Sequence, residues 1–136
     1  MPEISPETVR SEVARFWNAF SAKNVEVLED FYAHVSVGFG SSSTRSEPGR
    51  LSATRRQREY FGSSSPIRAQ VSQVDVVMIG ESAAVASYSF EFHATRATAT
   101  GKSEEKIRNG RATQVFAFDP DGRLRIFHEH FSLPAT

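Results

Sequence analysis

Residues 111–134 read RATQVFAFDPDGRLRIFHEHFSLP and contain the pattern that decides the fold. Two runs rich in β-branched and aromatic side chains flank residues 119–122, which read Asp-Pro-Asp-Gly. Asp at the first turn position, Pro at the second and Gly at the fourth are typical of a type I turn. The stretch therefore predicts an antiparallel hairpin that brings polar side chains of its two strands together.

Working outward, apolar residues recur at helical spacing near the N-terminus and with a period of two from residue 67 onward. Ser5 and Asn24 are suitable N-caps for two helices, and Thr54 with Gln57 resembles the capping box of a third. This order predicts an α+β fold, in which one curved antiparallel sheet carries three N-terminal helices on one face. The expected elements are helices near residues 6–22, 25–32 and 54–61 and strands at 35–39, 69–79, 83–96, 106–118 and 123–133.

Length and charge restrict the class of protein. We expect residues 1–136 to form a single domain. The chain has no cysteine, and its 16 basic and 16 acidic residues give no overall attraction to nucleic acid or to an anionic membrane. The polar N-terminus has no signal-peptide pattern, and no apolar run approaches the ~20 residues of a membrane span. The expected location is the cytoplasm.

The motifs GRATQVFAFDPDGRLRIFHEHFS and IGESAAVASYSF resemble the nuclear transport factor 2-like superfamily, also called the cystatin-like fold, and within it the SnoaL-like and ketosteroid isomerase-like branch. The last hairpin, with its Asp-Gly turn and His-x-His tail, also resembles the association domain of calcium/calmodulin-dependent protein kinase II. The resemblance implies a cone with an interior pocket and a homodimer formed through the outer sheet face. The eleven Phe, three Tyr and one Trp agree with a buried oligomer face.

The catalytic groups of the steroid isomerases have no counterpart in this chain. Their helix tyrosine falls on Phe16, their base on Phe39 or Gly40, and their second acid on Gln114. A phenyl ring cannot abstract a proton and a glutamine cannot ionise, so the resemblance does not imply isomerase activity. Tyr32 matches a supporting tyrosine of some isomerases, and the Asp/His arrangement of the polyketide cyclases is absent.

The resemblance also implies which side chains line the interior. We expect Gln114 to lie opposite Phe127, and Glu129 opposite Ala112. A carboxylate enclosed by aromatic rings is desolvated, so Glu129 is the candidate acid or base, or the anchor for a cationic or hydrogen-bonding ligand. The alternative is that Glu129 has only a structural role, either paired with an arginine or exposed to water at the rim of the pocket. The expected ligand-binding residues are Phe16, Trp17, Tyr32, Phe39, Gln114, Phe127, Glu129 and Phe131.

The opposite face of the same hairpin presents Arg111, Thr113, His128 and His130. We expect Arg111 to lie across from His130 and Thr113 across from His128. These groups suit an anion site or a pH-sensitive interface, because histidine titrates near neutrality. A hydrogen-bond network buried in a dimer interface is the alternative. We expect no metal or cofactor, because no third ligand accompanies the two histidines and Arg111 would repel a cation.

Two further segments leave alternatives open. In residues 83–96, Tyr88, Phe90 and Phe92 share one strand face, and Ser87, Ser89, Glu91 and His93 share the other. Alternation alone puts the aromatic face in the core. Alignment of the turn with the kinase domain instead puts the polar face in the pocket, and we favour this second assignment. The arginines of residues 45–68 suit a lid over an acidic ligand or a solvated helix face, and we favour the solvated face.

Three functions follow from these patterns. The first is a SnoaL-like protein with an interior pocket for a small, partly apolar ligand. The second is an isomerase, cyclase or dehydratase that uses Glu129 as acid or base, and the third is an oligomerisation module. The sequence leaves open whether the chain is an enzyme.

Overall fold

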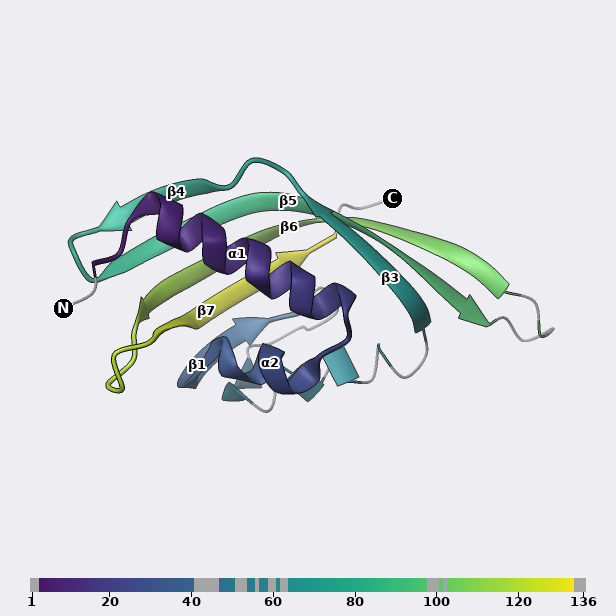
Figure 1. Ribbon diagram of the computed structural model, residues 1–136, viewed down its shortest axis with the longest axis horizontal. Helices are drawn as coiled ribbons and strands as arrows, with labels where there is room; N and C mark the ends of the chain where they lie inside the picture. Colours follow the sequence, from purple (N-terminus) through teal and green to yellow (C-terminus); the bar gives the residue numbers. More distant parts are fainter. Residues whose placement is uncertain are drawn as a thin grey trace.

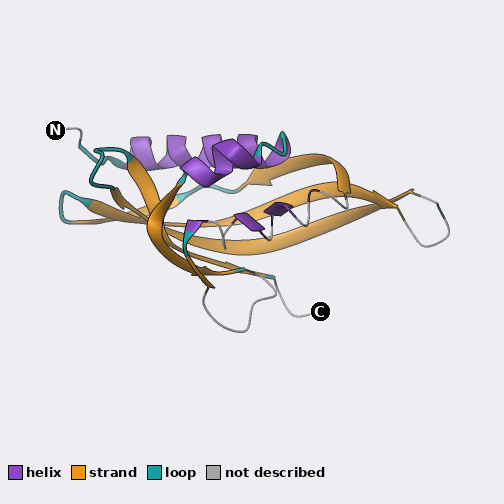
Figure 2. Cartoon of the chain, turned by 90° about the horizontal axis from the view of Figure 1, so that it is seen from below, coloured by secondary structure: helices purple, strands orange, loops and turns teal. Residues whose placement is uncertain are grey.

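A curved, unclosed sheet covered on one face by helices forms the fold (Figure 1). The computed structural model describes residues 3–40, 47–50, 54, 55, 57, 58, 61, 64–97, 101 and 103–133. Helices α1 (Pro6–Ser21) and α2 (Val25–Asp30) lie over the same face of the sheet (Figure 2). This confirms the expected α+β class. The strands are β1 (Tyr32–Phe39), β2 (Glu47–Pro48), β3 (Ser64–Val71), β4 (Asp75–Ile79), β5 (Ala83–Ala97), β6 (Ser103–Phe118) and β7 (Leu124–Ser132).

The strand order is β2-β1-β7-β6-β5-β3, with β4 also paired to β5. All pairs are antiparallel except β1 with β7, which run parallel. The parallel pair joins segments far apart in sequence, for example Gly38 with Glu129. The single strand expected at residues 69–79 is in fact two strands, β3 and β4. Just after β3, Ser72 Oγ accepts a hydrogen bond from the Ser89 N–H (2.9 Å), in the place of a backbone carbonyl.

The caps that the sequence predicts begin both helices. Ser5 Oγ accepts from the Thr8 N–H (3.1 Å), and Asn24 Oδ1 accepts from the Val27 N–H (3.2 Å). The second helix is shorter than expected, since it ends at Asp30. The Phe31 carbonyl accepts from the Ile126 N–H (2.7 Å), so the chain joins the sheet at once and Tyr32 belongs to β1.

The structure bounds two of the three expected N-terminal helices. Of residues 54–61, those at 54, 55, 57, 58 and 61 are described, and all five are helical. Arg45 and Arg56 of the suggested lid lie outside the described residues. Arg50 donates to the Tyr32 carbonyl (2.7 Å), and Arg58 pairs with Glu29 (2.5 Å), so these two arginines have structural partners.

The last hairpin has the predicted turn but not the predicted register. Gly122, with φ of 84°, donates its N–H to the Asp119 carbonyl (2.8 Å), and Phe118 pairs with Leu124. A β-bulge at Phe127 then adds one more residue to β7. The turn and the bulge each shift the expected pairing by one residue.

In consequence, Gln114 lies opposite Glu129, and Ala112 lies opposite Phe131. The expected pairings of Gln114 with Phe127 and of Ala112 with Glu129 were wrong. Glu129 nevertheless faces the interior, because it lies beyond the bulge.

The favoured assignment of β5 was also wrong. Tyr88 and Phe90 are buried, whereas Ser87 and Ser89 are exposed, so the aromatic face meets the helices as simple alternation indicates. The reason is packing against α1, since the Trp17 ring stacks on the Phe90 ring with centroids 4.9 Å apart. Aromatic pairs of this kind stabilise a core beyond their buried area.

Arg125 forms a clamp that the sequence did not reveal. Its side chain is only 6% exposed and pairs with Asp30 (2.9 Å), Asp119 (3.1 Å) and Asp121 (2.6 Å). Hydrogen bonds from Arg125 lower the pKa of both Asp30 and Asp121. The clamp ties the end of α2 to the turn of the last hairpin.

Candidate functional site

A chain of buried hydrogen bonds leads from α1 across the sheet to β7. The Trp17 indole N–H donates to the Tyr88 hydroxyl (2.9 Å), and the Tyr88 O–H donates to Gln114 Oε1 (2.7 Å). Gln114 Nε2 then donates to Glu129 Oε1 (2.7 Å). Each of these residues is at least nine-tenths buried, so the chain runs through the interior.

A second branch reaches Glu129 from the opposite side. The Tyr32 O–H donates to both Glu129 oxygens (2.9 and 2.7 Å), and Gln57 Nε2 donates to the Tyr32 hydroxyl (3.2 Å). The two branches form what we call the interior network: Trp17, Tyr88, Gln114, Glu129, Tyr32 and Gln57. Glu129 is 3% exposed and stands where the branches meet.

The interior network has one direction. An indole N–H can only donate, and Glu129 accepts from both Gln114 and Tyr32. Every hydrogen bond between these two groups therefore points toward Glu129. Burial strongly raises the pKa of the Tyr88 hydroxyl, so Tyr88 keeps the proton that it donates to Gln114.

Three buried polar side-chain atoms have no hydrogen-bond partner among the described residues: Gln57 Oε1, Ser36 Oγ and Arg125 Nε, of which Arg125 Nε still lies 3.1 Å from the Asp119 carboxylate. Gln57 Oε1 belongs to the interior network, and Ser36 Oγ lies on β1. Unpartnered buried polar atoms are uncommon in folded proteins. Gln57 Oε1 and Ser36 Oγ are therefore candidate contacts for a bound molecule.

The structure brings together most of the expected interior residues. Phe16, Trp17 and Tyr32 form one cluster of buried rings, against which the half-buried Phe131 packs. Gln114 and Glu129 join this cluster through the hydrogen bonds described above.

Phe39 and Phe127 are not brought into that cluster. The Phe39 ring lies 5.3 Å from the His130 ring, on the other face of the sheet. Phe127 is half-buried at the bulge, and Ile126 occupies the core instead.

Sequence reasoning missed two members of the interior network. The favoured reading of residues 83–96 turns Tyr88 away from the pocket, although the alternation of its strand was a sufficient signal. Gln57 was considered only as part of a capping box. Nothing in the sequence indicates that its side chain reaches Tyr32, 25 positions away.

The four residues expected on the outer face of the hairpin lie there in a shifted register. Thr113 lies opposite His130, and Arg111 opposite Ser132. His128 pairs with Val115 rather than with Thr113. The expected pairs were wrong for the same reason as in the interior, namely the turn and the bulge.

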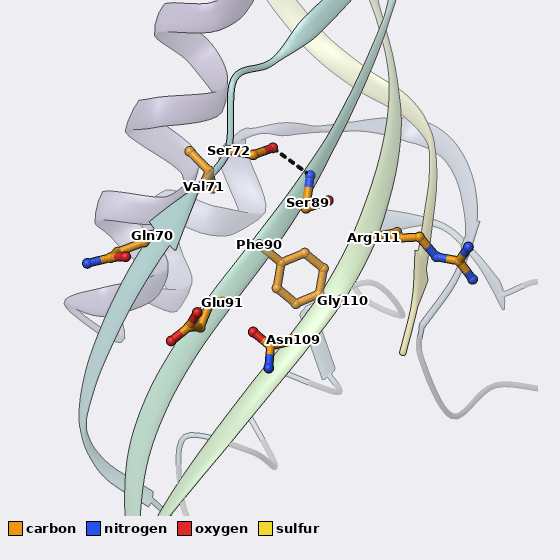
Figure 3. Close-up of a pocket in the computed structure, with 9 residues that line it drawn as sticks. All are labelled: Gln70, Val71, Ser72, Ser89, Phe90, Glu91, Asn109, Gly110 and Arg111. Carbon is orange, nitrogen blue, oxygen red and sulfur yellow. Dashed lines mark hydrogen bonds between the residues drawn. The ribbon is translucent and has the colours of Figure 1, made fainter. Parts of the chain in front are cut away.

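A groove with a volume of about 610 Å³ lies on the outer face of the sheet, over β3, β5 and β6 (Figure 3). We call it the outer groove. The Phe90 ring lies beside Gly110 between two strands, and the Glu91 and Arg111 side chains point away from each other (Figure 3). Its lining residues are Gln70, Val71, Ser72, Ser89, Phe90, Glu91, Asn109, Gly110 and Arg111.

A charged cluster lies next to the outer groove. His93 contacts Glu105 through Nδ1 (3.0 Å) and Glu91 through Nε2 (2.6 Å), and Glu105 also pairs with Arg68 (3.2 Å). The hydrogen bonds to Glu105 and then to Glu91 raise the pKa of His93. The hydrogen bond from His93 lowers the pKa of Glu105.

We expect His93 to titrate with a midpoint above 6.5, its ordinary value, because both ring nitrogens face carboxylates. Because the pKa of His93 is higher in the folded protein than in the unfolded chain, charged His93 stabilises the folded protein fully at pH below the unfolded pKa. This stabilisation is lost as the pH rises through the folded pKa. An NMR titration of the ring protons measures this midpoint. The Glu105→Gln variant should lower it, whereas Glu81→Gln, in an exposed turn, should not. An unchanged midpoint in Glu105→Gln would contradict the assignment.

Gly38 sets how closely β1 approaches Glu129. A Cβ atom at this position would lie 2.6 Å from the Glu129 carbonyl oxygen. We expect Gly38→Ala to lower the free energy of unfolding by about 1–3 kcal/mol, because β1 and β7 must separate. Urea unfolding measures the loss. Gly101→Ala is the control for a substitution with nothing within 4 Å, although its φ of 82° adds local strain. A loss for Gly38→Ala below that of the control would show that the strands adjust freely.

Among the described residues, no group of three or more His, Asp or Glu side chains is arranged to hold a metal ion. No described helix is long and apolar enough to cross a membrane.

Known structures have the same architecture. A proposed dehydratase of the nuclear transport factor 2-like family from Streptomyces avermitilis has a TM-score of 0.79 at 17% identity, over 96% of this chain and 97% of the other. A proposed calcium/calmodulin dependent protein kinase II association domain from Xanthomonas campestris has a TM-score of 0.75 at 18% identity, over 98% and 95%. A proposed scytalone dehydratase from Novosphingobium aromaticivorans has a TM-score of 0.80 at 9% identity, over 93% and 82%.

These likenesses define a nuclear transport factor 2-like, cystatin-like fold. The sequence model of the SnoaL-like domain matches residues 9–136, so the chain belongs to the SnoaL-like family. A comparison with curated proteins gave no match. The resemblance predicted from the hairpin motifs is thereby confirmed.

Proposed function

We propose that this SnoaL-like chain binds a small, partly apolar ligand in its interior, beside Glu129. The observation that supports this is a carboxylate, 3% exposed, held between Tyr32 and Gln114 in a cluster of aromatic rings. Burying a carboxylate is costly even when it is well bonded, and apolar side chains of similar volume often give a more stable core. A carboxylate in such surroundings is therefore a candidate functional group.

The direction of the interior network supports an anchoring role for Glu129. Enolate chemistry needs donors aimed at the oxygen of the substrate. Here the Tyr88 hydrogen is donated to Gln114 and the Tyr32 hydrogen to Glu129, inside the protein. The arrangement stabilises the negative charge of the protein's own carboxylate rather than one that develops on a substrate.

Acid–base catalysis of a dehydratase, isomerase or cyclase type is the second candidate. The Tyr32 hydroxyl lies 2.7 Å from Glu129 Oε2, so a proton could be shared between these two groups during a reaction. Two of the similar structures are proposed dehydratases, which favours this class among enzymes.

Binding can be tested with three hydroxylated probes of increasing size: cyclohexanol, 4-ethylphenol and 2-naphthol. Trp17 is the one tryptophan of the chain, so its indole N–H gives a single NMR resonance inside the interior network. We expect at least one probe to shift this resonance, and we expect Glu129→Gln to weaken its binding about 10-fold or more, because an amide in place of the carboxylate disturbs the hydrogen bonds to Tyr32 and, through Tyr32, to Gln57. Asn109→Arg, in the outer groove, is the control that should not. No shift with any probe up to its solubility limit would refute the interior site.

Catalysis can be tested without knowing the substrate. A carboxylate base that reaches the carbon next to a ketone carbonyl exchanges the hydrogens of that carbon with solvent. Wild-type protein in D₂O should therefore accelerate deuterium incorporation into 2-tetralone. Loss of this acceleration in Glu129→Gln would support the enzyme. No acceleration by the wild type, together with probe binding, would leave the ligand-binding function alone.

We also propose that the outer face of the sheet docks against a second copy of the chain. One row of aligned residues crosses this face from β4 to β1: Val77, Val85, Val115, His128 and Val37. Val77 is 64% exposed. The same face carries Glu91 and Arg111, so a two-fold arrangement can match opposite charges between identical surfaces.

Sedimentation of the wild type and of Val37→Lys tests whether the chain forms this dimer. The lysine should convert a dimer to monomers, because it places a charge in the apolar row. Val27→Lys is a matched control, since Val27 on α2 is 40% exposed and Val37 is 38% exposed. A wild-type monomer at high protein concentration would refute the proposal.

A further inference from the structure

Gln57 indicates which kind of polar group the interior ligand carries. We infer that the ligand is recognised through a hydrogen-bond donor, a hydroxyl or an amine, which Gln57 Oε1 accepts. This inference rests on the interior site proposed above and names the chemistry of its ligand.

The orientation of the Gln57 amide follows from its neighbour. The Tyr32 hydroxyl donates its one hydrogen to Glu129 (2.7 Å), so toward Gln57 its oxygen can only accept. The Gln57 atom 3.2 Å from that oxygen must therefore be the donor Nε2. A flipped amide would place two acceptor oxygens against each other, so Oε1 is the end that points away from Tyr32.

That outward end is buried and lacks a hydrogen-bond partner in the described part of the chain. Gln57 is 8% exposed, and its Oε1 accepts no hydrogen bond there. A buried acceptor left without a donor destabilises the folded protein, and a ligand that supplies the donor removes this penalty. Binding would thus satisfy a group that the described residues leave unsatisfied.

Ser36 contributes a second buried polar atom that could contact the ligand. Its Oγ is buried and has no partner among the described residues, and it lies on β1 two positions before Gly38, which pairs with Glu129. A hydroxyl can accept or donate, so Ser36 is compatible with a ligand donor. The Gln57 acceptor, by contrast, gains no hydrogen bond from a ketone, ether or nitrile, which bring acceptors only.

Matched probe pairs test this polarity. Each pair has the same apolar body, with a hydroxyl in one member and its methyl ether in the other. The pairs are cyclohexanol with methoxycyclohexane, 4-ethylphenol with 4-ethylanisole, and 2-naphthol with 2-methoxynaphthalene. Affinity is read from the Trp17 indole resonance. We expect the hydroxyl member to bind about 10-fold tighter or more, and cyclohexylamine as a further arm separates an amine from a hydroxyl.

The variant Gln57→Met assigns the preference to one side chain. It keeps the length of the side chain and removes the acceptor, so the hydroxyl and the ether should bind equally. Gln70→Met, an exposed glutamine of the outer groove, is the matched control and should keep the preference.

The outcomes separate the two proposals. If hydroxyl and ether bind equally to the wild type, the donor inference is wrong and the interior site stands. If the preference persists in Gln57→Met, Gln57 is not the acceptor and the inference is wrong. If no probe shifts the Trp17 resonance, the interior site itself is refuted.

Discussion

Gln114→Leu should lower the free energy of unfolding by about 3–5 kcal/mol. The leucine removes the acceptor of the buried Tyr88 hydroxyl (2.7 Å) and a donor to the buried Glu129 carboxylate (2.7 Å). Both partners are left in the interior, where water does not replace the lost bonds. Urea unfolding at pH 7 measures the change.

An exposed glutamine provides the control for this substitution. Gln73→Leu, between β3 and β4, should change the stability by less than about 0.5 kcal/mol. The double variant Tyr88→Phe/Gln114→Leu should be less destabilised than the sum of its single variants, because no tyrosine hydroxyl is then left without an acceptor. A cost for Gln114→Leu similar to that of Gln73→Leu would show that the interior network contributes nothing to stability.

Phe16→Ala should lower the free energy of unfolding by about 3–5 kcal/mol, because it opens a cavity in the aromatic core. The Phe16 ring is fully buried and meets the rings of Trp17 (5.6 Å between centroids), Phe31 (5.7 Å) and Tyr32 (6.1 Å). Differential scanning calorimetry or urea unfolding measures the change.

The Phe16→Leu variant should lose clearly less stability than Phe16→Ala, because a smaller cavity remains. Val27→Ala, on the exposed surface of α2, is the control for shortening a side chain without a cavity. A loss below about 1.5 kcal/mol for Phe16→Ala would mean that the core collapses around the missing ring.

Local chemistry made most of the fold predictable. The Ser5 and Asn24 side chains cap the helices where the sequence places them, and the turn at residues 119–122 forms with the expected hydrogen bonds. These features depend on residues three or four positions apart. The aromatic residues Phe16 and Trp17 were predictable as interior residues because their spacing marks one face of a helix.

The register of the hairpin and the interior network were not predictable in the same way. The bulge at Phe127 depends on how two strands adjust to the curvature of the whole sheet, and no local signal marks it. The parity of β5 was read wrongly because an alignment of its turn was preferred to its own alternation. The contact of Gln57 with Tyr32 depends on a segment whose position the sequence does not fix.

The pairing of β1 with β7 has a consequence for synthesis on the ribosome. Tyr32 and Glu129 are 97 positions apart, so at typical elongation rates roughly 5–20 s separate their translation. During that interval β1 is an open edge that carries Val35 and Val37, which remain exposed even in the folded chain. A nascent chain stalled before residue 129 should therefore present β1 to chaperones, and the interior network should form only once β7 has emerged.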